Sequence, residues 1–227
     1  MNQEFFQRLE EGLATERLDA YRQDGVAPIV TLARYLWNIA LCESLYSPLQ
    51  LAEIALRNSI HRTLTSRHGR EDWYVGLDDL STWQATQLES ACTQIQKRDK
   101  EVTPGRVVAE LHFGFWTGFF NKTQAQTGLG HALASQAFPN APRSERNLRK
   151  LDARWKRIRD LRNRVFHHER VIHWSDLDAQ HEDLLEIIRW INPELQQVAI
   201  ALDRYRAIRQ GGVDPWLEKI RLHWPTS

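Results

Sequence analysis

Apolar residues recur at three- and four-residue steps along most of the chain, which is the periodicity of amphipathic α-helices. Residues 3–23 follow this pattern until Asp24-Gly25 interrupts it, and residues 29–45 form a strongly apolar segment of the same kind. Ser47-Pro48 predicts a new start, since proline is well tolerated in a first helical turn. Another helix is therefore expected over residues 49–65.

The remaining sequence keeps this periodicity, with glycine, proline and N-capping residues at the breaks. No alternation typical of strands and no fixed-period repeat is visible, so the predicted fold class is all-α, a single domain over residues 1–227 built as a helical bundle. A loop is predicted over 66–80, a helix from Ser81 or Thr82 to about Lys100, one from Thr103-Pro104 to near Phe120, and one short piece within 121–142. A helix over about 144–170, starting at Ser144, precedes a last long helix from Ser175 or Asp176, kinked at Asn192-Pro193 and closed by Gly211-Gly212 before a short amphipathic tail.

The composition is that of an ordinary globular protein, with 42% hydrophobic and 26% charged residues in a chain of 227. A chain of this length can bury one substantial core or at most two small ones. The formal net charge of +1 excludes a generally basic nucleic-acid binder, but it leaves room for a local basic face.

Cysteine usage and hydropathy bear on the compartment. Cys42 and Cys92 show no repeated spacing, which favours free thiols in a reducing compartment over a disulfide or zinc framework. The first six residues lack the basic start and apolar run of a secretory leader. The most apolar stretch, residues 107–120, is interrupted by Glu110 and His112 and is too short to span a bilayer. We expect a cytoplasmic protein with no membrane segment.

Charge is distributed unevenly along the second half of the chain. Residues 143–170 hold eleven Lys and Arg against four Asp and Glu, whereas residues 175–194 hold six acidic residues against Arg189 alone. Two interpretations stay open at this point. The two segments could be consecutive antiparallel helices that complement each other, or part of the basic face could also attract a phosphate backbone.

The segment Arg162-Asn163-Arg164-Val165-Phe166-His167-His168-Glu169 carries the densest chemistry of the chain. Arg162 falls on an apolar helical stripe, four residues after Ile158 and three before Val165. A guanidinium keeps its charge, so in a core-facing position it needs a carboxylate, carbonyl groups or a bound anion. The stripe consists of Leu148, Leu151, Trp155, Ile158 and Val165.

Arginine and histidine together suit the cleavage of RNA by its own 2′-hydroxyl. A histidine, with an ordinary pKa of about 6.5, can take or give a proton at neutral pH, and a guanidinium fork fits phosphate oxygens. A cation also stabilises the charge that develops on the phosphorane. This chemistry requires no metal and no cofactor, and it selects RNA because DNA lacks the 2′-hydroxyl.

The spacing places a condition on this chemistry. Five positions separate Arg162 from His167 by about 140° around an ideal helix, whereas Asn163 and His167 share a face, as do Arg164 and His168. Arg162 and His167 can meet one phosphate only where the helix ends or bends, or where a second subunit contributes. A twofold dimer would place two such segments against each other in one cleft.

The segment resembles the arginine-to-histidine signature of the HEPN superfamily in its RNxxxH form, with Arg162, Asn163 and then His167 after three residues. Together with three further blocks in the same order, it resembles the Abi-like (abortive infection) protein family over roughly residues 35–175. Arg170 departs from the pattern, because many relatives have proline after His-His-Glu. The three blocks are Tyr35-Leu36-Trp37-Asn38, Leu51-Ala52-Glu53-Ile54-Ala55-Leu56-Arg57-Asn58 and Phe113-Gly114-Phe115-Trp116.

The resemblance implies an HEPN-like helical bundle with additional N- and C-terminal helices, usually a homodimer, and a metal-independent endoribonuclease used in phage defence or as a toxin. RNA is then a partner, and an antitoxin or regulatory protein could be another. By this resemblance Arg162 and His167 are the catalytic pair, Asn163 orients the histidine or the phosphate, and His168 assists. The remaining expected roles are substrate binding by Arg164, Arg57 and Asn58, and support by Glu53 and Glu169.

Simpler interpretations of the motif stay open. Arg162 could form a buried ion pair with Glu53, Asp160 or an acid of the 175–194 helix, and histidines at a helix C-terminus are favoured by the macrodipole. On this interpretation the chain is a catalytically silent helical module that binds RNA or another protein.

Two other groups of residues have alternatives. A metal site from His167, His168, Glu169 and His173 is disfavoured, because adjacent helical residues diverge by about 100°. In the polar group of Glu53, Arg57, Asn58 and His61, neighbours one turn apart could form surface ion pairs, while Arg57 and Asn58 could instead line the cleft or hold the motif helix in place.

Overall fold

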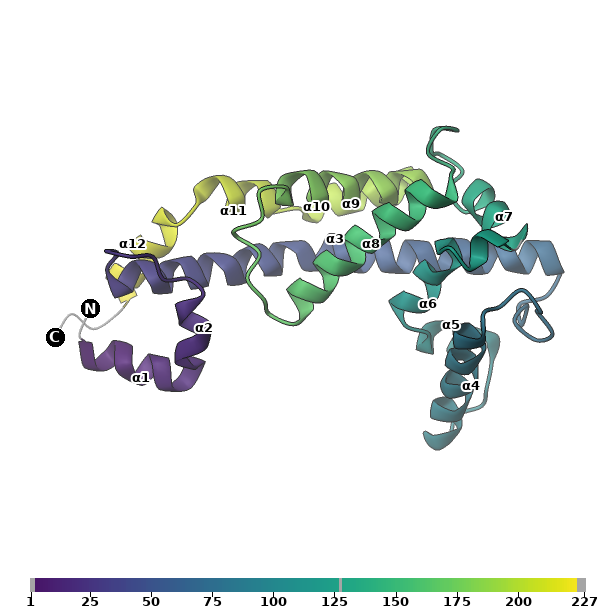
Figure 1. Ribbon diagram of the computed structural model, residues 1–227, viewed down its shortest axis with the longest axis horizontal. Coiled ribbons are helices and arrows are strands. Elements are labelled where there is room, and N and C mark those ends of the chain that lie inside the picture. The colour runs from purple at the N-terminus through teal and green to yellow at the C-terminus, as the bar shows by residue number, and fades with distance from the viewer. Residues whose placement is uncertain (1–2, 127, 224–227) are drawn as a thin grey trace. The chain divides into compact units, whose positions relative to one another are not determined.

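The computed structural model describes residues 3–126 and 128–223, and every regular element within these ranges is a helix. The all-α prediction is thereby confirmed for the described part of the chain (Figure 1). The first two residues and the last four of the predicted C-terminal tail lie outside it. The helices are α1 (Gln3–Leu13), α2 (Thr15–Asp19), α3 (Pro28–His68), α4 (Thr82–Lys97), α5 (Pro104–Glu110), α6 (Phe113–Thr117), α7 (Gly128–Gln136), α8 (Leu148–Phe166), α9 (Leu177–Ile191), α10 (Pro193–Leu202), α11 (Tyr205–Gly211) and α12 (Asp214–His223), with 3₁₀ turns η1 (Gly118–Phe120) and η2 (Gln124–Gln126).

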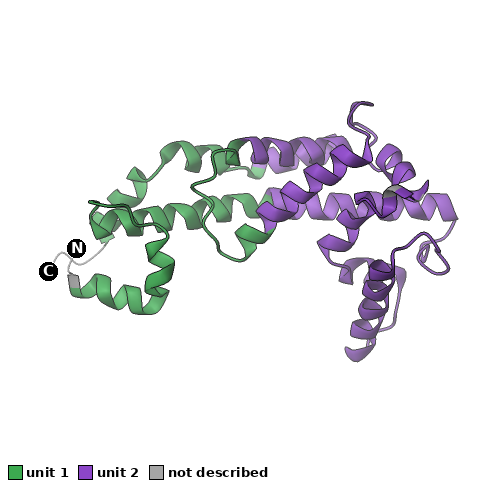
Figure 2. Cartoon of the chain, in the orientation of Figure 1, with its two compact units in different colours: residues 1–47, 163–178, 202–227 green, residues 48–162, 179–201 purple. Residues whose placement is uncertain are grey.

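The chain divides into two compact units, each assembled from separate stretches of sequence (Figure 2). Unit 1 comprises Met1–Ser47, Asn163–Asp178 and Leu202–Ser227, and unit 2 comprises Pro48–Arg162 and Ala179–Ala201. Helices α3, α8, α9 and α10 each contribute residues to both units. The expectation of one domain over the whole chain stays a prediction.

Helix α3 is continuous over 41 residues, so the predicted restart at Ser47-Pro48 is wrong. Pro48 lies inside the helix, where it removes one backbone hydrogen bond at a cost of about 3 kcal/mol. Leu45 and Leu49, on either side of Pro48, are 0% and 2% exposed. Burial of such side chains on both sides of the proline offsets its local cost.

Other predicted boundaries shift where a local hydrogen bond or break decides them. Helix α4 starts at the predicted place, with Ser81 as N-cap in a capping box with Gln84, but it ends at Lys97 and not near Lys100. The motif helix α8 begins at Leu148 and not at Ser144, because the Asn147 side chain accepts from the backbone N–H groups of Arg149 and Lys150. The segment predicted as a single helix over 103–120 is divided into α5, α6 and η1. The helix predicted after Ser175 breaks at Asn192-Pro193, where the kink is expected, and ends at Gly211 as predicted, but a second break separates α10 from α11.

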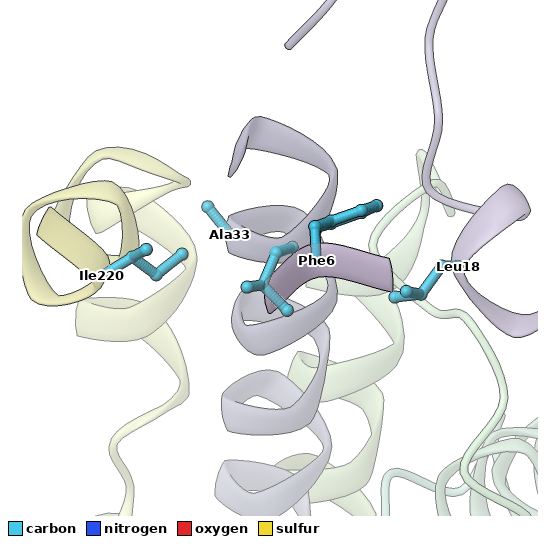
Figure 3. Packing of buried hydrophobic residues seen from close by; sticks show 5 residues of the cluster. Phe6, Leu18, Ala33 and Ile220 are labelled. Atoms are coloured by element: carbon cyan, nitrogen blue, oxygen red, sulfur yellow. The ribbon is translucent and has the colours of Figure 1, made fainter. Parts of the chain in front are cut away.

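Unit 1 has a core in which α1, α2 and α12 pack on the start of α3. Phe6 of α1, Leu18 of α2, Leu32 and Ala33 of α3, and Ile220 of α12 are buried against one another (Figure 3). Burial of each larger side chain contributes about 1.5–3 kcal/mol. Partly buried residues around this cluster are Leu9, Leu13, Ile29, Tyr35, Leu36, Val213, Trp216 and Leu217.

Unit 2 has an aromatic core around α6. The rings of Trp73 and Phe119 lie 6.3 Å apart, and those of Phe115 and Trp116 lie 5.0 Å apart, each pair edge to face. All four side chains are at most 1% exposed. The block Phe113-Gly114-Phe115-Trp116 is therefore a packing element, and its buried rings are not available to stack on bases.

The basic and acidic segments of the second half pair within unit 2. Arg154 Nη1 donates to Glu186 Oε2 at 2.6 Å, and Arg157 Nη1 donates to Asp183 Oδ2 at 3.0 Å. The Arg154 guanidinium also lies 4.2 Å above the centroid of the Trp190 ring. Complementary packing of α8 against α9 thus accounts for part of the charge segregation.

No helix in residues 3–126 and 128–223 combines the length and the apolar content needed to cross a bilayer.

Candidate functional site

The motif helix α8 ends inside the predicted motif, at Phe166, in a Schellman turn of unit 1. The Glu169 N–H donates to the Arg164 carbonyl at 2.9 Å, and the His168 N–H donates to the Val165 carbonyl at 3.2 Å. His168 adopts the left-handed conformation that this turn requires, with φ of 58°. The condition that the helix ends at the motif is therefore met, although the helix is shorter than the predicted 144–170.

Left-handed backbone at a residue other than glycine costs about 1 kcal/mol and persists only where surrounding contacts hold it. In unit 1 these contacts come from α2 and α3. Arg17 Nη1 donates to the His168 carbonyl at 2.9 Å, and Asn38 Nδ2 donates to the Glu169 carbonyl at 3.1 Å. The turn that carries both histidines is thus held from two sides.

Asn38 continues this bracing along the chain that follows the motif. Its Oδ1 accepts from the Val171 N–H at 2.8 Å and from the Ile172 N–H at 3.3 Å, and its side chain is 2% exposed. Sequence reasoning did not select Asn38 as a site residue. The available signal was its place on the apolar stripe of α3, three residues before Leu41 and seven before Leu45.

The turn presents its imidazoles to solvent. His167 and His168 are exposed, and Asn163, one turn before His167, is half-buried. Arg164 and Glu169 form an ion pair across the turn. Among the residues that the structure describes, neither imidazole forms a hydrogen bond, ion pair or ring contact, so both are available to a ligand.

Two arginines, Arg164 and Arg170, act on a histidine that follows the turn. Burial, together with the guanidinium groups of Arg170 and Arg164, lowers the pKa of nearby His173. Arg170 itself donates to the Ala20 carbonyl, so its charge is fixed beside α2. A cation held near exposed imidazoles favours an anionic ligand.

Arg162 belongs to unit 2, where it is half-buried beside Glu53 of α3. Its Nε lies 3.6 Å from Glu53 Oε2, with the two side chains 32% and 30% exposed. This is one of the ion pairs that the sequence offered as a simpler interpretation, and it fits the supporting role expected for Glu53. At this exposure the pair contributes little stability.

The polar group on α3 in unit 2 is arranged differently from a run of ion pairs. Arg57 Nε donates to Asn58 Oδ1 at 3.4 Å, and Glu53 pairs with Arg162. Among the described residues, no ion pair joins Glu53 to Arg57. Asn58 is exposed and Arg57 half-buried. His61 turns to the core instead, where its Nδ1 accepts from Trp73 Nε1 at 2.9 Å.

The Trp73 bond predicts a pH dependence of stability. An indole N–H can only donate, so His61 is neutral with its proton on Nε2. Burial lowers its pKa below the ordinary value of 6.5, so the stabilisation is present above pH 6.5 and is lost as pH falls through the folded-state value. We expect the thermal midpoint of wild type to fall more between pH 7.5 and 5 than that of His61→Asn, whose amide oxygen can still accept from Trp73. The exposed His131→Asn should follow wild type, and parallel curves for all three proteins would contradict the assignment.

Two cavities lie apart from the predicted site residues. One, of about 470 Å³ in unit 1, is lined by Phe6, Gln7, Glu10, Arg22, Ala27, Pro28 and Ile29. The other, of about 450 Å³ in unit 2, is lined by Arg62, Thr63, Ser66, Arg67 and Gln136. The motif histidines lie instead on an exposed turn, which suits a polymer more than an enclosed small molecule.

Metal-binding geometry does not occur at the motif. In residues 3–126 and 128–223, no group of three or more His, Cys, Asp and Glu side chains is arranged to hold an ion. The set of His167, His168, Glu169 and His173 therefore has no geometric support.

The structure brings Asn163, Arg164, His167, His168 and Glu169 together in unit 1, while Arg162, Glu53, Arg57 and Asn58 belong to unit 2. Joint action of Arg162 and His167 stays a prediction. Comparison of the chain with protein-family models, with curated proteins and with solved structures found no match.

Proposed function

We propose that this chain is a metal-independent endoribonuclease of the HEPN type, resembling the Abi-like family, that acts in phage defence or as a toxin. The observation that carries the proposal is the pair of exposed imidazoles on a braced turn beside Arg164 and Arg170. General acid-base catalysis on a phosphodiester needs such groups held in place and open to a polymer.

In the proposed reaction His167 takes the proton of a ribose 2′-hydroxyl, whose oxygen attacks the adjacent phosphorus. The bond from phosphorus to the 5′-oxygen breaks, and that oxygen leaves with a proton supplied by an imidazolium, from His168 or from the second copy of His167. The products are a 2′,3′-cyclic phosphate and a 5′-hydroxyl. Arg162 stabilises the charge on the phosphorane, and Asn163 orients His167 or the phosphate.

We further propose that the active form is a homodimer whose two motif turns share one cleft. Two copies would supply two Arg162 side chains and both copies of His167 and His168 to one RNA strand. Arg162 of one copy could then act with His167 of the other, so the separation of about 140° within one helix would no longer matter. Arg164, Arg57 and Asn58 would bind the RNA backbone, with Glu53 and Glu169 holding the arginines. An antitoxin or regulatory protein would act by covering this cleft.

The test is cleavage of single-stranded RNA by the purified full-length protein in excess EDTA. We expect products that end in 2′,3′-cyclic phosphate and 5′-hydroxyl groups, and no cleavage of the all-deoxy strand, which lacks the attacking hydroxyl. Cleavage of the deoxy strand, or 3′-hydroxyl and 5′-phosphate ends, would rule out this mechanism.

One observation favours a second candidate, a catalytically silent RNA-binding module. Arg162 already lies beside a carboxylate, 3.6 Å from Glu53, so its charge has a use other than transition-state stabilisation. On this alternative the protein binds RNA in a filter or anisotropy assay and leaves it intact. RNA cleavage by the wild-type protein that is lost in Arg162→Ala would exclude the silent module.

A further inference from the structure

The cavity of about 450 Å³ in unit 2 has a lining made entirely of polar side chains. It lies where the C-terminal part of α3 meets the end of α7, two segments that Figure 1 draws side by side and that Ser59 joins by donating to the Ala137 carbonyl at 2.7 Å. Arg62, Thr63, Ser66 and Arg67 come from α3, and Gln136 closes α7.

The donors of this cavity are unengaged. Within the described ranges, no hydrogen bond or ion pair involves the side chains of Arg62, Ser66, Arg67 or Gln136. Only Thr63 is committed, since its hydroxyl donates to the Ser59 carbonyl at 2.8 Å. Two exposed guanidinium groups, a hydroxyl and an amide thus line the same cavity, and no carboxylate of the described residues does.

The helix dipole accounts for the position of Arg67 but not for that of Arg62. Arg67 lies in the last turn of α3, where a cation complements the helix dipole. Arg62 lies six residues before the end of the helix, beyond the reach of that effect. Two cations that line one cavity without a counter-ion repel each other, and an oxyanion between them reverses the sign of the interaction.

We propose that this cavity binds a phosphate group. Guanidinium forks match phosphate oxygens, and a hydroxyl and an amide N–H complete a set of donors suited to acceptors only. The volume is in the range of small-molecule sites, so the phosphate can carry an attached nucleoside. The proposal is independent of RNA cleavage, since it concerns binding alone.

The experiment is thermal unfolding of the full-length protein in rising inorganic phosphate, with ionic strength held constant by sodium chloride. A ligand that binds only the folded state raises the unfolding midpoint in a concentration-dependent way. We expect this rise in wild type and in Arg143→Gln/Arg149→Gln, which removes two exposed arginines of the 143–150 segment. We expect it to vanish in Arg62→Gln/Arg67→Gln.

Two further arms identify the carrier of the phosphate. A mononucleotide site predicts that AMP gives the same rise, again lost in Arg62→Gln/Arg67→Gln, with the affinity for single-stranded RNA unchanged. A site for the RNA backbone predicts that the variant binds the RNA about tenfold more weakly than the arginine control does, with a shallower salt dependence. Equal midpoint rises in the cavity variant and in wild type, or equal losses in the cavity variant and its control, would overturn the proposal.

Discussion

Replacement of His167 by alanine is expected to lower the single-turnover rate of RNA cleavage by about 10²–10⁴-fold, the usual contribution of a positioned acid or base. Its thermal midpoint should stay that of wild type. The reason is that the imidazole is exposed and, within the described residues, makes no hydrogen bond, ion pair or ring contact that the substitution removes. The backbone bond from the His167 N–H to the Asn163 carbonyl, at 2.9 Å, survives in alanine.

A loss of cleavage without a loss of thermal stability would show that His167 takes part in the reaction and not in packing. His112→Ala is the matched control, because His112 is also exposed and makes no side-chain capping bond to α6. It should cleave RNA at the wild-type rate. A His167→Ala protein that melts normally and cleaves as fast as His112→Ala would remove His167 from the mechanism, whatever the fate of the other motif residues.

The pH profile gives a second readout of the same assignment. A reaction that needs one neutral and one protonated imidazole has a bell-shaped rate profile, and loss of one partner removes one limb. The residual rate of His167→Ala should therefore depend on pH through a single limb. A merely structural contribution would scale the whole bell without changing its shape.

The fold was predictable from the sequence as far as local periodicity decides it. The apolar spacing and the capping residue at Ser81 identify helices whose determinants lie within a few residues. The helix restart predicted at Pro48 was wrong because the local cost of the proline is outweighed by burial of residues such as Leu45 and Leu49. This burial depends on distant parts of the chain. The helix start predicted at Ser144 was wrong because Asn147, three residues later, provides the capping oxygen.

The candidate site was predictable in its chemistry and less so in its support. The residue types in the segment from Arg162 to Glu169 were sufficient to select it as a candidate site. Glu53 was among the expected partners of Arg162. The bracing of the turn was not visible, because Asn38 and Glu169 are 131 positions apart and no local pattern relates them. A buried asparagine in an apolar stripe is nevertheless a signal that some distant backbone needs its amide.

The largest change in stability is expected from Asn38→Ala, which should lower the free energy of unfolding by about 2–4 kcal/mol. The substitution removes the acceptor of the Val171 and Ile172 N–H groups and the donor to the Glu169 carbonyl. Val171 and Ile172 are 0% and 7% exposed, so water replaces the lost bonds poorly. Urea unfolding of the variant measures the effect, and the exposed Asn58→Ala on the same helix should stay within about 0.5 kcal/mol of wild type.

Loss of this bracing should also appear locally, at Cys42. Burial raises the pKa of the Cys42 thiol to about 11, and its Sγ lies 3.7 Å from Asn38 Nδ2 and 4.0 Å from the Glu169 carbonyl. In wild type, alkylation at pH 8 should therefore be confined to half-buried Cys92, whereas Asn38→Ala should expose Cys42 as the turn opens. Asn38→Asp keeps the shape and the acceptor but cannot donate to the Glu169 carbonyl, so it should also be less stable than wild type. If both variants instead show the urea midpoint and the Cys42 alkylation rate of wild type, Asn38 does not hold the turn. The left-handed conformation of His168 would then depend on the hydrogen bond from Arg17 and not on Asn38.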